Sequence, residues 1–118
     1  MKSFEGKIYI GFKETHTGII HTLQEAEAIC QKYCDETGFC VTLTPTDFIY
    51  TKGKEPGCIV GTIQYPRFPT DEDILKERTL TIAREFSEQF NQFRITVNFP
   101  DEVVMIDNDK VIMTREMK

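Results

Sequence analysis

The chain has 118 residues and a formal charge of −5, with 40% hydrophobic and 28% charged residues. This length is enough for one domain, residues 1–118, and the composition is typical of a soluble globular protein rather than a collagen or a disordered tail. No uninterrupted apolar run approaches the roughly 20 residues that a membrane-spanning helix needs. A net negative field repels phosphate backbones, so we expect neither a nucleic acid nor a membrane as partner.

The N-terminal segment, residues 1–12, lacks the charged and apolar regions of a secretion signal, so we expect a cytoplasmic protein, in the host cytoplasm if it is viral. In that reducing compartment the four cysteines are expected to be free structural thiols, with no metal and no cofactor. The alternative is a zinc site formed by three thiols and one imidazole: Cys30, Cys34 and Cys40 with His16 or His21. Their spacing lacks the C-x2-C pair of common zinc sites, which favours the structural interpretation.

The first predicted elements are a strand and a helix. The β-branched and aromatic run Lys7–Phe12 predicts a strand. The sequence Thr22-Leu-Gln-Glu25 is a capping box, in which the residues at the two ends bond each other's backbone N–H groups. Apolar residues at helical spacing then predict a helix over Leu23–Thr37, and Gly38 is suited to the left-handed residue that ends it.

Two further strands are predicted to form a hairpin. Phe39–Tyr50 is rich in β-branched and aromatic residues, and Pro45 indicates an edge strand or a bulge. The Gly- and Pro-rich segment Lys52–Gly57 predicts the connecting turn. Cys58–Tyr65 then reads as the return strand, in which Gly61 indicates a bulge or a close approach by a ligand or backbone.

The remaining elements are a helix, a strand and a hairpin. Thr70 is the expected N-cap of a helix over Asp71–Asn91, because the acidic residues that follow it favour the positive end of a helix. Arg94–Phe99 predicts a strand. Val103–Ile106 and Val111–Thr114 predict a hairpin, since the Asp-Asn-Asp segment between them tolerates left-handed backbone.

This order of elements predicts an α+β fold. The split β-α-β-β-α-β pattern is that of ferredoxin-like domains, with an antiparallel sheet, two helices on one face and here a C-terminal β-hairpin. The other face of the sheet needs a cover. A second copy of the chain is the simplest one, so we expect a homo-oligomer, a dimer or higher; an alternative places the helices at the dimer seam.

The most unusual segment is QYPRFP, in which two prolines hold the residues between them in extended geometry. Arg67 can fork onto a phosphate or carboxylate, and Tyr65 and Phe68 can stack a planar base. The alternative is a structural corner that packs Phe68 into the core and pairs Arg67 with Asp71 or Glu72.

Three other places offer polar groups to a ligand. The strand hydroxyl of Thr44 can meet a ribose or phosphate, although threonine is also a favoured strand residue. Glu55, in the loop with two lysines, can meet a ribose hydroxyl or Arg67. Asn91 and Arg94 lie where the second helix meets the next strand, and Arg94 is expected to converge with Arg67 if its strand neighbours the one ending at Tyr65.

An enzymatic interpretation remains open beside these binding sites. His16 and His21 could act as acid and base at neutral pH, and Cys58 is a further reactive candidate. Such a protein would be a small ferredoxin-like enzyme acting on a nucleotide or a small carboxylate metabolite. The alternative is that both histidines are structural, and the sequence contains no nucleophile elbow, H-E-x-x-H or Walker motif.

The run TLTPTDFIYTKGKEPGCIVGTIQYPRFP, together with the predicted plan of two capped helices, resembles the phage anti-Thoeris sponge proteins. That resemblance implies a phage binding module, rather than an enzyme, that evades host defence by sequestering cyclic ADP-ribose signals made by TIR-domain proteins. The implied ligand is an adenine nucleotide with a pyrophosphate, held in a preformed pocket that an oligomer could complete. The ligand-binding candidates are Tyr65, Arg67, Phe68, Thr44, Arg94, Asn91 and Glu55.

Overall fold

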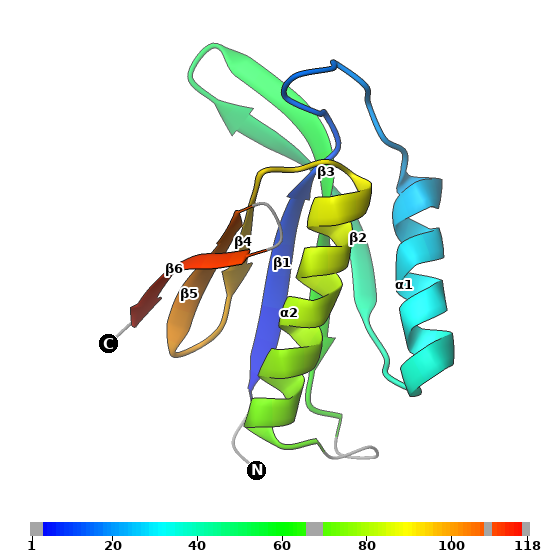
Figure 1. Ribbon diagram of the computed structural model, residues 1–118, viewed down its shortest axis with the longest axis vertical. Helices are drawn as coiled ribbons and strands as arrows, with labels where there is room; N and C mark the ends of the chain where they lie inside the picture. Colours follow the sequence, from blue (N-terminus) through cyan, green and yellow to red (C-terminus); the bar gives the residue numbers. More distant parts are fainter. Residues whose placement is uncertain (1–3, 66–69, 108–109, 117–118) are drawn as a thin grey trace.

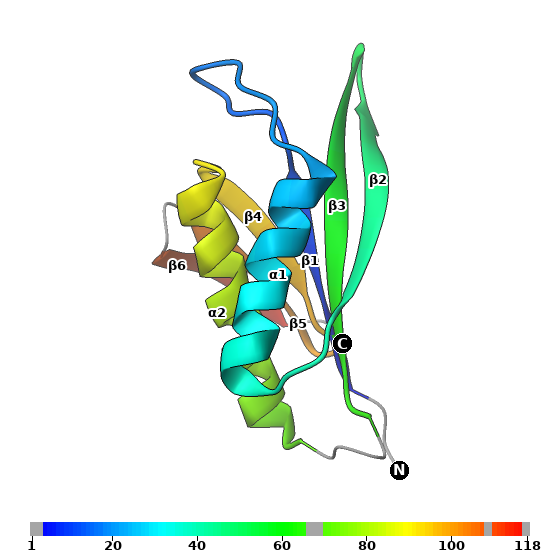
Figure 2. The same cartoon turned by 90° about the vertical axis from the view of Figure 1, so that its right-hand side faces the viewer.

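The computed structural model describes residues 4–65, 70–107 and 110–116, the last range by its backbone only. Within these ranges, six strands form one antiparallel sheet in the order β2-β3-β1-β4-β5-β6, and two helices lie together on one face of it (Figures 1 and 2). The elements are β1 Glu5–Gly11, α1 Leu23–Thr37, β2 Thr42–Tyr50, β3 Gly53–Ile63, α2 Glu72–Gln89, β4 Arg94–Asn98, β5 Glu102–Asp107 and β6 Lys110–Glu116. The predicted fold class, including the C-terminal hairpin, is confirmed.

The core lies between the helices and the sheet. Successive side chains of a strand point to opposite faces, so the central strand β1 buries Ile8 and Ile10 completely under the helices and turns Tyr9 to the open face. Helix α2 turns a buried stripe toward the sheet, and it includes Leu75 and Phe86. Among the described residues, the open face therefore carries every second residue of each strand and no helix.

The first helix begins and ends at the predicted residues because both signals are local. The Thr22 side chain accepts a hydrogen bond from the Glu25 N–H at 3.2 Å, and the Glu25 carboxylate accepts one from the Thr22 N–H at 3.3 Å. At the other end Gly38 has φ 74° and donates its N–H to the Cys34 carbonyl at 2.8 Å. The capping box and the glycine stop are both confirmed.

The second helix differs from its predicted ends by a few residues. Its N-cap is Asp71 and not Thr70, because Asp71 is still extended while its carbonyl already accepts the N–H of Leu75 at 2.9 Å. The helix ends at Gln89, and Asn91 beyond it takes a left-handed conformation with φ 49°. The chain can then turn directly into β4.

The hairpin of β2 and β3 is longer than predicted. The segment Lys52–Gly57 was expected to be a turn, but the turn is confined to residues 51–52, with Lys52 at φ 60°. Residues from Gly53 onward pair with β2, because the backbone groups of a long hairpin are satisfied by its partner strand even where glycine and proline are frequent. Glu55 is therefore a strand residue opposite Phe48.

The pairing of β2 with β3 also decides between the alternatives predicted for Pro45 and Gly61. β2 is an edge strand, as Pro45 indicated, and the register runs through the Pro45–Cys58 pair without a shift. At Gly61 a Cβ would lie 2.4 Å from the hydroxyl oxygen of Thr42, so the glycine allows a close approach between strands and makes no bulge. In the described part of the chain, no helix is long and apolar enough to cross a membrane.

Candidate functional site

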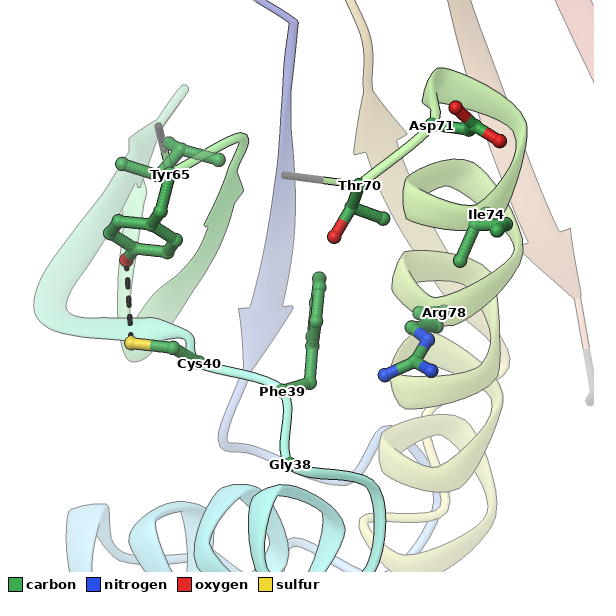
Figure 3. A pocket seen from close by; sticks show the side chains of 9 residues that line it. Gly38, Phe39, Cys40, Tyr65, Thr70, Asp71, Ile74 and Arg78 are labelled. Carbon is green, nitrogen blue, oxygen red and sulfur yellow. Dashed lines mark hydrogen bonds between the residues drawn. The ribbon is translucent and has the colours of Figure 1, made fainter. Parts of the chain in front are cut away.

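Two clefts in the described structure contain ligand-binding candidates from the sequence. The strand-end cleft has a volume of about 590 Å³ and is lined by Thr15, His16, Glu55, Gln92, Phe93, Arg94 and Asp107. The helix-start cleft has a volume of about 400 Å³ and is lined by Gly38, Phe39, Cys40, Ile63, Tyr65, Thr70, Asp71, Ile74 and Arg78 (Figure 3). They lie at opposite ends of the sheet.

The charged groups of the strand-end cleft come from neighbouring strands. Glu55 lies on β3, Arg94 on β4 and Asp107 on β5, while β1 runs between β3 and β4. At Gly11 of β1 an added Cβ would lie 3.0 Å from the Glu55 Oε2 atom. The Glu55 carboxylate therefore occupies the space over β1 that a side chain at this position would fill.

These charged groups have no partner among the described residues. Arg94 and Asp107 are opposite each other in the β4–β5 register, yet no ion pair joins them. No side-chain hydrogen bond or ion pair within the described ranges engages Glu55 either. Two carboxylates and one guanidinium are thus free to bond polar groups of a ligand, and hydrogen bonds to charged groups are stronger than neutral ones.

The cleft also has an aromatic wall. His16 and Phe93 meet edge to face, with ring centroids 5.1 Å apart and an angle of 67° between the planes. Phe93 is held near α2, because the backbone carbonyl of the neighbouring Gln92 accepts the Ser87 hydroxyl of α2 at 2.8 Å. The Gln92 side-chain N–H donates to the Lys13 carbonyl at 2.9 Å. A ring pair of this kind can pack against a planar base.

The loop that carries His16 is anchored by a carboxylate–imidazole–carboxylate cluster. The His21 Nε2 atom lies 2.6 Å from Glu14 and its Nδ1 atom 2.7 Å from Glu25. The ring is stacked parallel on Phe90 at 4.2 Å between centroids. Asn91 donates its side-chain N–H to Glu14 at 3.3 Å, so Asn91 supports the loop and does not line the cleft.

The cluster shifts the pKa values of its members. Burial alone would lower the pKa of His21, but its hydrogen bonds to Glu25 and Glu14 and their negative charges outweigh burial and raise that pKa above 6.5. The hydrogen bond to His21 is the largest influence on each carboxyl group and lowers the pKa of both Glu14 and Glu25 below 4.5.

The helix-start cleft is organised around an aromatic ring, a guanidinium and a phenol. Figure 3 shows Phe39 between Tyr65 on one side and Arg78 of α2 on the other. The Arg78 guanidinium lies 5.3 Å from the Phe39 ring centroid and donates to the Thr37 carbonyl at 3.5 Å. The Cys40 Sγ atom and the Tyr65 hydroxyl oxygen are within hydrogen-bond distance at 3.5 Å; the interaction with Cys40 and burial raise the pKa of Tyr65 to about 12, so the phenol stays protonated.

The predicted binding residues do not all meet. Arg67 and Phe68 lie outside the described residues. Tyr65 follows the end of β3 that pairs with Glu5, whereas Arg94 lies at the opposite end of the sheet. The expected neighbourhood of their two strands was wrong, because β1 lies between β3 and β4.

Of the other predicted residues, Glu55 and Arg94 are brought into one cleft. Thr44 lies on the edge strand opposite Ile59 and lines neither cleft. Sequence reasoning missed Phe93 and Asp107 as cleft residues. Asp107 was read as part of a turn, and only the β4–β5 register shows that it faces Arg94.

The predicted reactive groups are also separated. His16 lines the strand-end cleft, whereas His21 is held between carboxylates outside it. Cys58 is buried, and desolvation raises the pKa of its thiol to about 12, which makes it a poor nucleophile. Cys40 is exposed rather than part of the core. In the described ranges, no group of three or more His, Cys, Asp or Glu side chains is arranged to hold a metal ion.

Neither a protein-family model nor a curated protein sequence matches this chain. Two solved structures are similar to it in fold. One is a phage SAM lyase in complex with S-methyl-5′-thioadenosine, with a TM-score of 0.68, 12% identity, and coverage of 98% of this chain and 89% of the other. The second is a phage SAM lyase in the apo state, with a TM-score of 0.65, 14% identity and coverage of 98% and 88%.

These likenesses establish a shared fold over nearly the whole chain. The neighbours are phage proteins, as the resemblance found in the sequence also implied, and one of them holds a nucleoside. They are lyases, however, and not sponge proteins.

Proposed function

We propose that this protein binds an adenine nucleoside with a thioether at its 5′ position, of the S-methyl-5′-thioadenosine type, in the strand-end cleft. The observation that carries the proposal is the shared fold, over 98% of the chain, with a phage protein that holds this nucleoside. The cleft volume of about 590 Å³ is within the common range for small-molecule sites.

The cleft residues suit the parts of such a ligand. The paired rings of His16 and Phe93 offer an apolar surface to the adenine. The Glu55 carboxylate over β1 can accept hydrogen bonds from the two ribose hydroxyls, because an ionised carboxylate is purely an acceptor. Arg94 and Asp107 remain to bond the polar edge of the base or the substituent at the 5′ position.

The charge of the cleft favours a neutral or cationic ligand. Two carboxylates, Glu55 and Asp107, stand against the one guanidinium of Arg94. A pyrophosphate placed there would meet more negative than positive charge, which costs binding free energy. Cyclic ADP-ribose is the ligand implied by the sequence resemblance. Its adenine suits the aromatic wall, but its pyrophosphate suits the negative charge of the cleft less well than a neutral group does.

A second candidate function is cleavage of SAM in the same cleft. S-methyl-5′-thioadenosine remains when the bond between the sulfonium sulfur of SAM and its aminocarboxypropyl group breaks with the electron pair going to sulfur. The carboxylate of the departing group can close on the carbon that sulfur leaves, which gives a lactone. The structural neighbours are SAM lyases. The sulfonium of SAM is positively charged, and the excess of carboxylates in the cleft favours it. This candidate corresponds to the enzymatic interpretation left open by the sequence.

The binding proposal is tested by isothermal titration calorimetry with S-methyl-5′-thioadenosine, SAM and cyclic ADP-ribose. We expect one molecule of S-methyl-5′-thioadenosine per chain. Glu55→Gln removes a charged acceptor at a cost of about 1.5–3 kcal/mol, so affinity should fall about 10- to 100-fold. Lys54→Gln is the matched control, since Lys54 is exposed, adjacent on β3 and not part of the cleft. No binding, or equal affinity in both variants, would overturn the proposal.

Mass spectrometry of the incubated ligands separates binding from catalysis. Release of S-methyl-5′-thioadenosine from SAM by the wild-type chain, lost in Glu55→Gln, would support the lyase candidate. Quantitative recovery of intact SAM after long incubation would exclude that reaction under the conditions used. Recovery of stoichiometric, unmodified cyclic ADP-ribose from the protein would instead support the sponge function.

A further inference from the structure

We propose that His21, held as an imidazolium between Glu14 and Glu25, is a positioning residue for the strand-end cleft, so that the cleft binds its ligand less well when this ring is neutral. The effect on ligand binding rests on the proposed function, because it requires that the strand-end cleft binds a ligand. The clasp itself, defined as Glu14, His21 and Glu25, stands on geometry alone.

The first step is the protonation state that the contacts require. Both ring nitrogens of His21 lie within 2.7 Å of a carboxylate oxygen, one from Glu14 and one from Glu25. An ionised carboxylate can only accept, so each nitrogen must carry a proton, and only the imidazolium has two N–H groups. A neutral ring would turn a lone pair toward one of the carboxylates and lose that contact.

The second step is that the ring cannot easily turn away. The His21 side chain is only 11% exposed and the Glu14 side chain 8%. The ring lies flat on Phe90, with an angle of 1° between the two planes, and Phe90 is itself buried at the end of α2. Losing one N–H therefore breaks either the part-buried contact with Glu14 or the contact with Glu25, whose side chain is 49% exposed, and no rotation of the ring within this site keeps both.

The third step is the electrostatic surroundings of the ring. The loop contributes Glu14 and helix α1 contributes Glu25, and these are the charges that act on its pKa. Helix α2 contributes the uncharged Phe90, and the Asn91 amide bonds Glu14. Lys32 lines a groove beside Glu25 and Phe90. The facing charges thus favour the imidazolium.

The fourth step connects the clasp to the cleft. Glu14 directly precedes Thr15 and His16, which line one side of the cleft. Through Asn91 it also bonds the segment that leads to Phe93 on the other side. The Thr17 hydroxyl donates to Glu14 at 2.8 Å and closes the loop around it. Of the two rings of the aromatic wall, His16 is therefore one residue from Thr17 and Phe93 two residues from Asn91, and both Thr17 and Asn91 bond the Glu14 carboxylate.

The direction of the pH effect follows from the pKa shifts. The pKa of His21 is raised above 6.5, so its contribution is complete below 6.5 and is lost as the pH rises through the raised value. The pKa values of Glu14 and Glu25 are lowered below 4.5, so their contribution is present above 4.5 and is lost as the pH falls through those values. The clasp is thus intact in the mildly acidic range and weakens toward alkaline pH.

The test begins with an NMR pH titration of the ligand-free wild-type chain. We expect the His21 ring to titrate above 6.5, with resonances of Thr15, His16 and Phe93 changing at the same midpoint. This experiment does not depend on any ligand. A His21 midpoint at or below 6.5, or a Phe93 resonance that does not follow it, would overturn the proposal.

The second measurement is the affinity for S-methyl-5′-thioadenosine between pH 6 and pH 9. We expect affinity to fall about tenfold through the His21 midpoint, the factor that one pKa unit of coupling provides. Glu25→Gln should move that midpoint to lower pH. His16→Gln is the control for direct titration in the cleft: it removes a ring of the aromatic wall and should lower affinity at every pH, but the His21 midpoint followed by NMR should stay that of the wild type.

The two experiments separate the possible failures. If S-methyl-5′-thioadenosine does not bind at any pH, the proposed function fails while the NMR titration still decides whether the clasp positions the cleft residues. If the ligand binds with an affinity that is constant across the His21 midpoint, the positioning role is refuted and the proposed function stands.

Discussion

At the scale of single residues, Gly11 and Glu55 form a pair across two strands. The chain at Gly11 does not adopt a left-handed conformation, so the glycine is explained by space rather than by backbone geometry. The atoms nearest to an added Cβ all belong to the Glu55 carboxylate. Because Gly11 on β1 has no side chain, the Glu55 carboxylate of β3 can lie over β1.

Gly11→Ala tests this pair. The new methyl group meets only the end of a flexible side chain, so we expect the free energy of unfolding to change by no more than about 0.5 kcal/mol. The Glu55 carboxylate must move, and we expect a roughly tenfold loss of affinity for S-methyl-5′-thioadenosine, about the effect of one hydrogen bond to a charged group. Urea denaturation and calorimetry measure the two quantities.

The Glu55→Gln background provides the control for that substitution. If Gly11 acts only through the Glu55 carboxylate, Gly11→Ala should have little further effect on affinity once that charge is removed. An undiminished tenfold loss in the double variant would contradict the coupling and indicate that the methyl group itself obstructs the cleft.

At the scale of elements, helix α2 and strand β3 are joined by a buried pair of hydroxyl groups. The Thr62 and Thr79 side-chain oxygens lie 2.8 Å apart, and both side chains are fully buried. Thr79 donates its proton to the Leu75 carbonyl at 2.6 Å, so Thr62 is the donor in the pair, with the Gly6 carbonyl at 3.5 Å as the alternative acceptor for its one proton. A polar contact thus fixes how the helix lies on the central strands.

Replacing one hydroxyl of this pair should lower the free energy of unfolding by more than half as much as replacing both. Thr79→Val leaves Thr62 without its closest partner, and we expect a loss of about 1–2 kcal/mol in the free energy of unfolding. The double variant Thr62→Val, Thr79→Val should lose less than the sum of the two single variants. Thr81→Val, on the exposed side of α2, is the control and should change stability by less than about 0.5 kcal/mol. Additive effects in urea denaturation would contradict a coupled pair.

The accuracy of the predicted elements depended on how local their signals are. Helix α1 was predicted to the residue because Thr22, Glu25 and Gly38 act within one turn of its ends. The predicted hairpin turn extended five residues too far, over Gly53–Gly57, because glycine and proline indicate a turn only where no partner strand satisfies the backbone. In β3 that partner is β2, and its pairing with Gly53 and Glu55 outweighs composition.

At the scale of the whole molecule, the sheet has one covered and one open face. The open face carries apolar side chains that are only half-buried in the single chain, among them Tyr9, Phe48, Ile59 and Met105. Large apolar groups left together on a surface are typical of an interface. The homo-oligomer expected from the sequence would cover them.

Sedimentation velocity tests this expectation. We expect the wild-type chain to sediment as a dimer or larger species, and Ile59→Lys to dissociate it, because a buried unpaired charge at an interface is costly. Gln31→Lys adds the same charge on exposed helix α1 and should leave assembly unchanged. A monomeric wild type would refute the expectation, whereas an oligomer unaffected by Ile59→Lys would favour the alternative seam through the helices.

The sequence by itself determined the order and type of the elements, the caps of α1 and the α+β class, because these follow from contacts between residues close in the chain. It also proposed Glu55 and Arg94 as ligand-binding candidates. Only the tertiary structure decided that these two share a cleft with Asp107 while Tyr65 lies at the other end of the sheet. Strand order and register carry that information, and both are set by pairing between segments far apart in sequence.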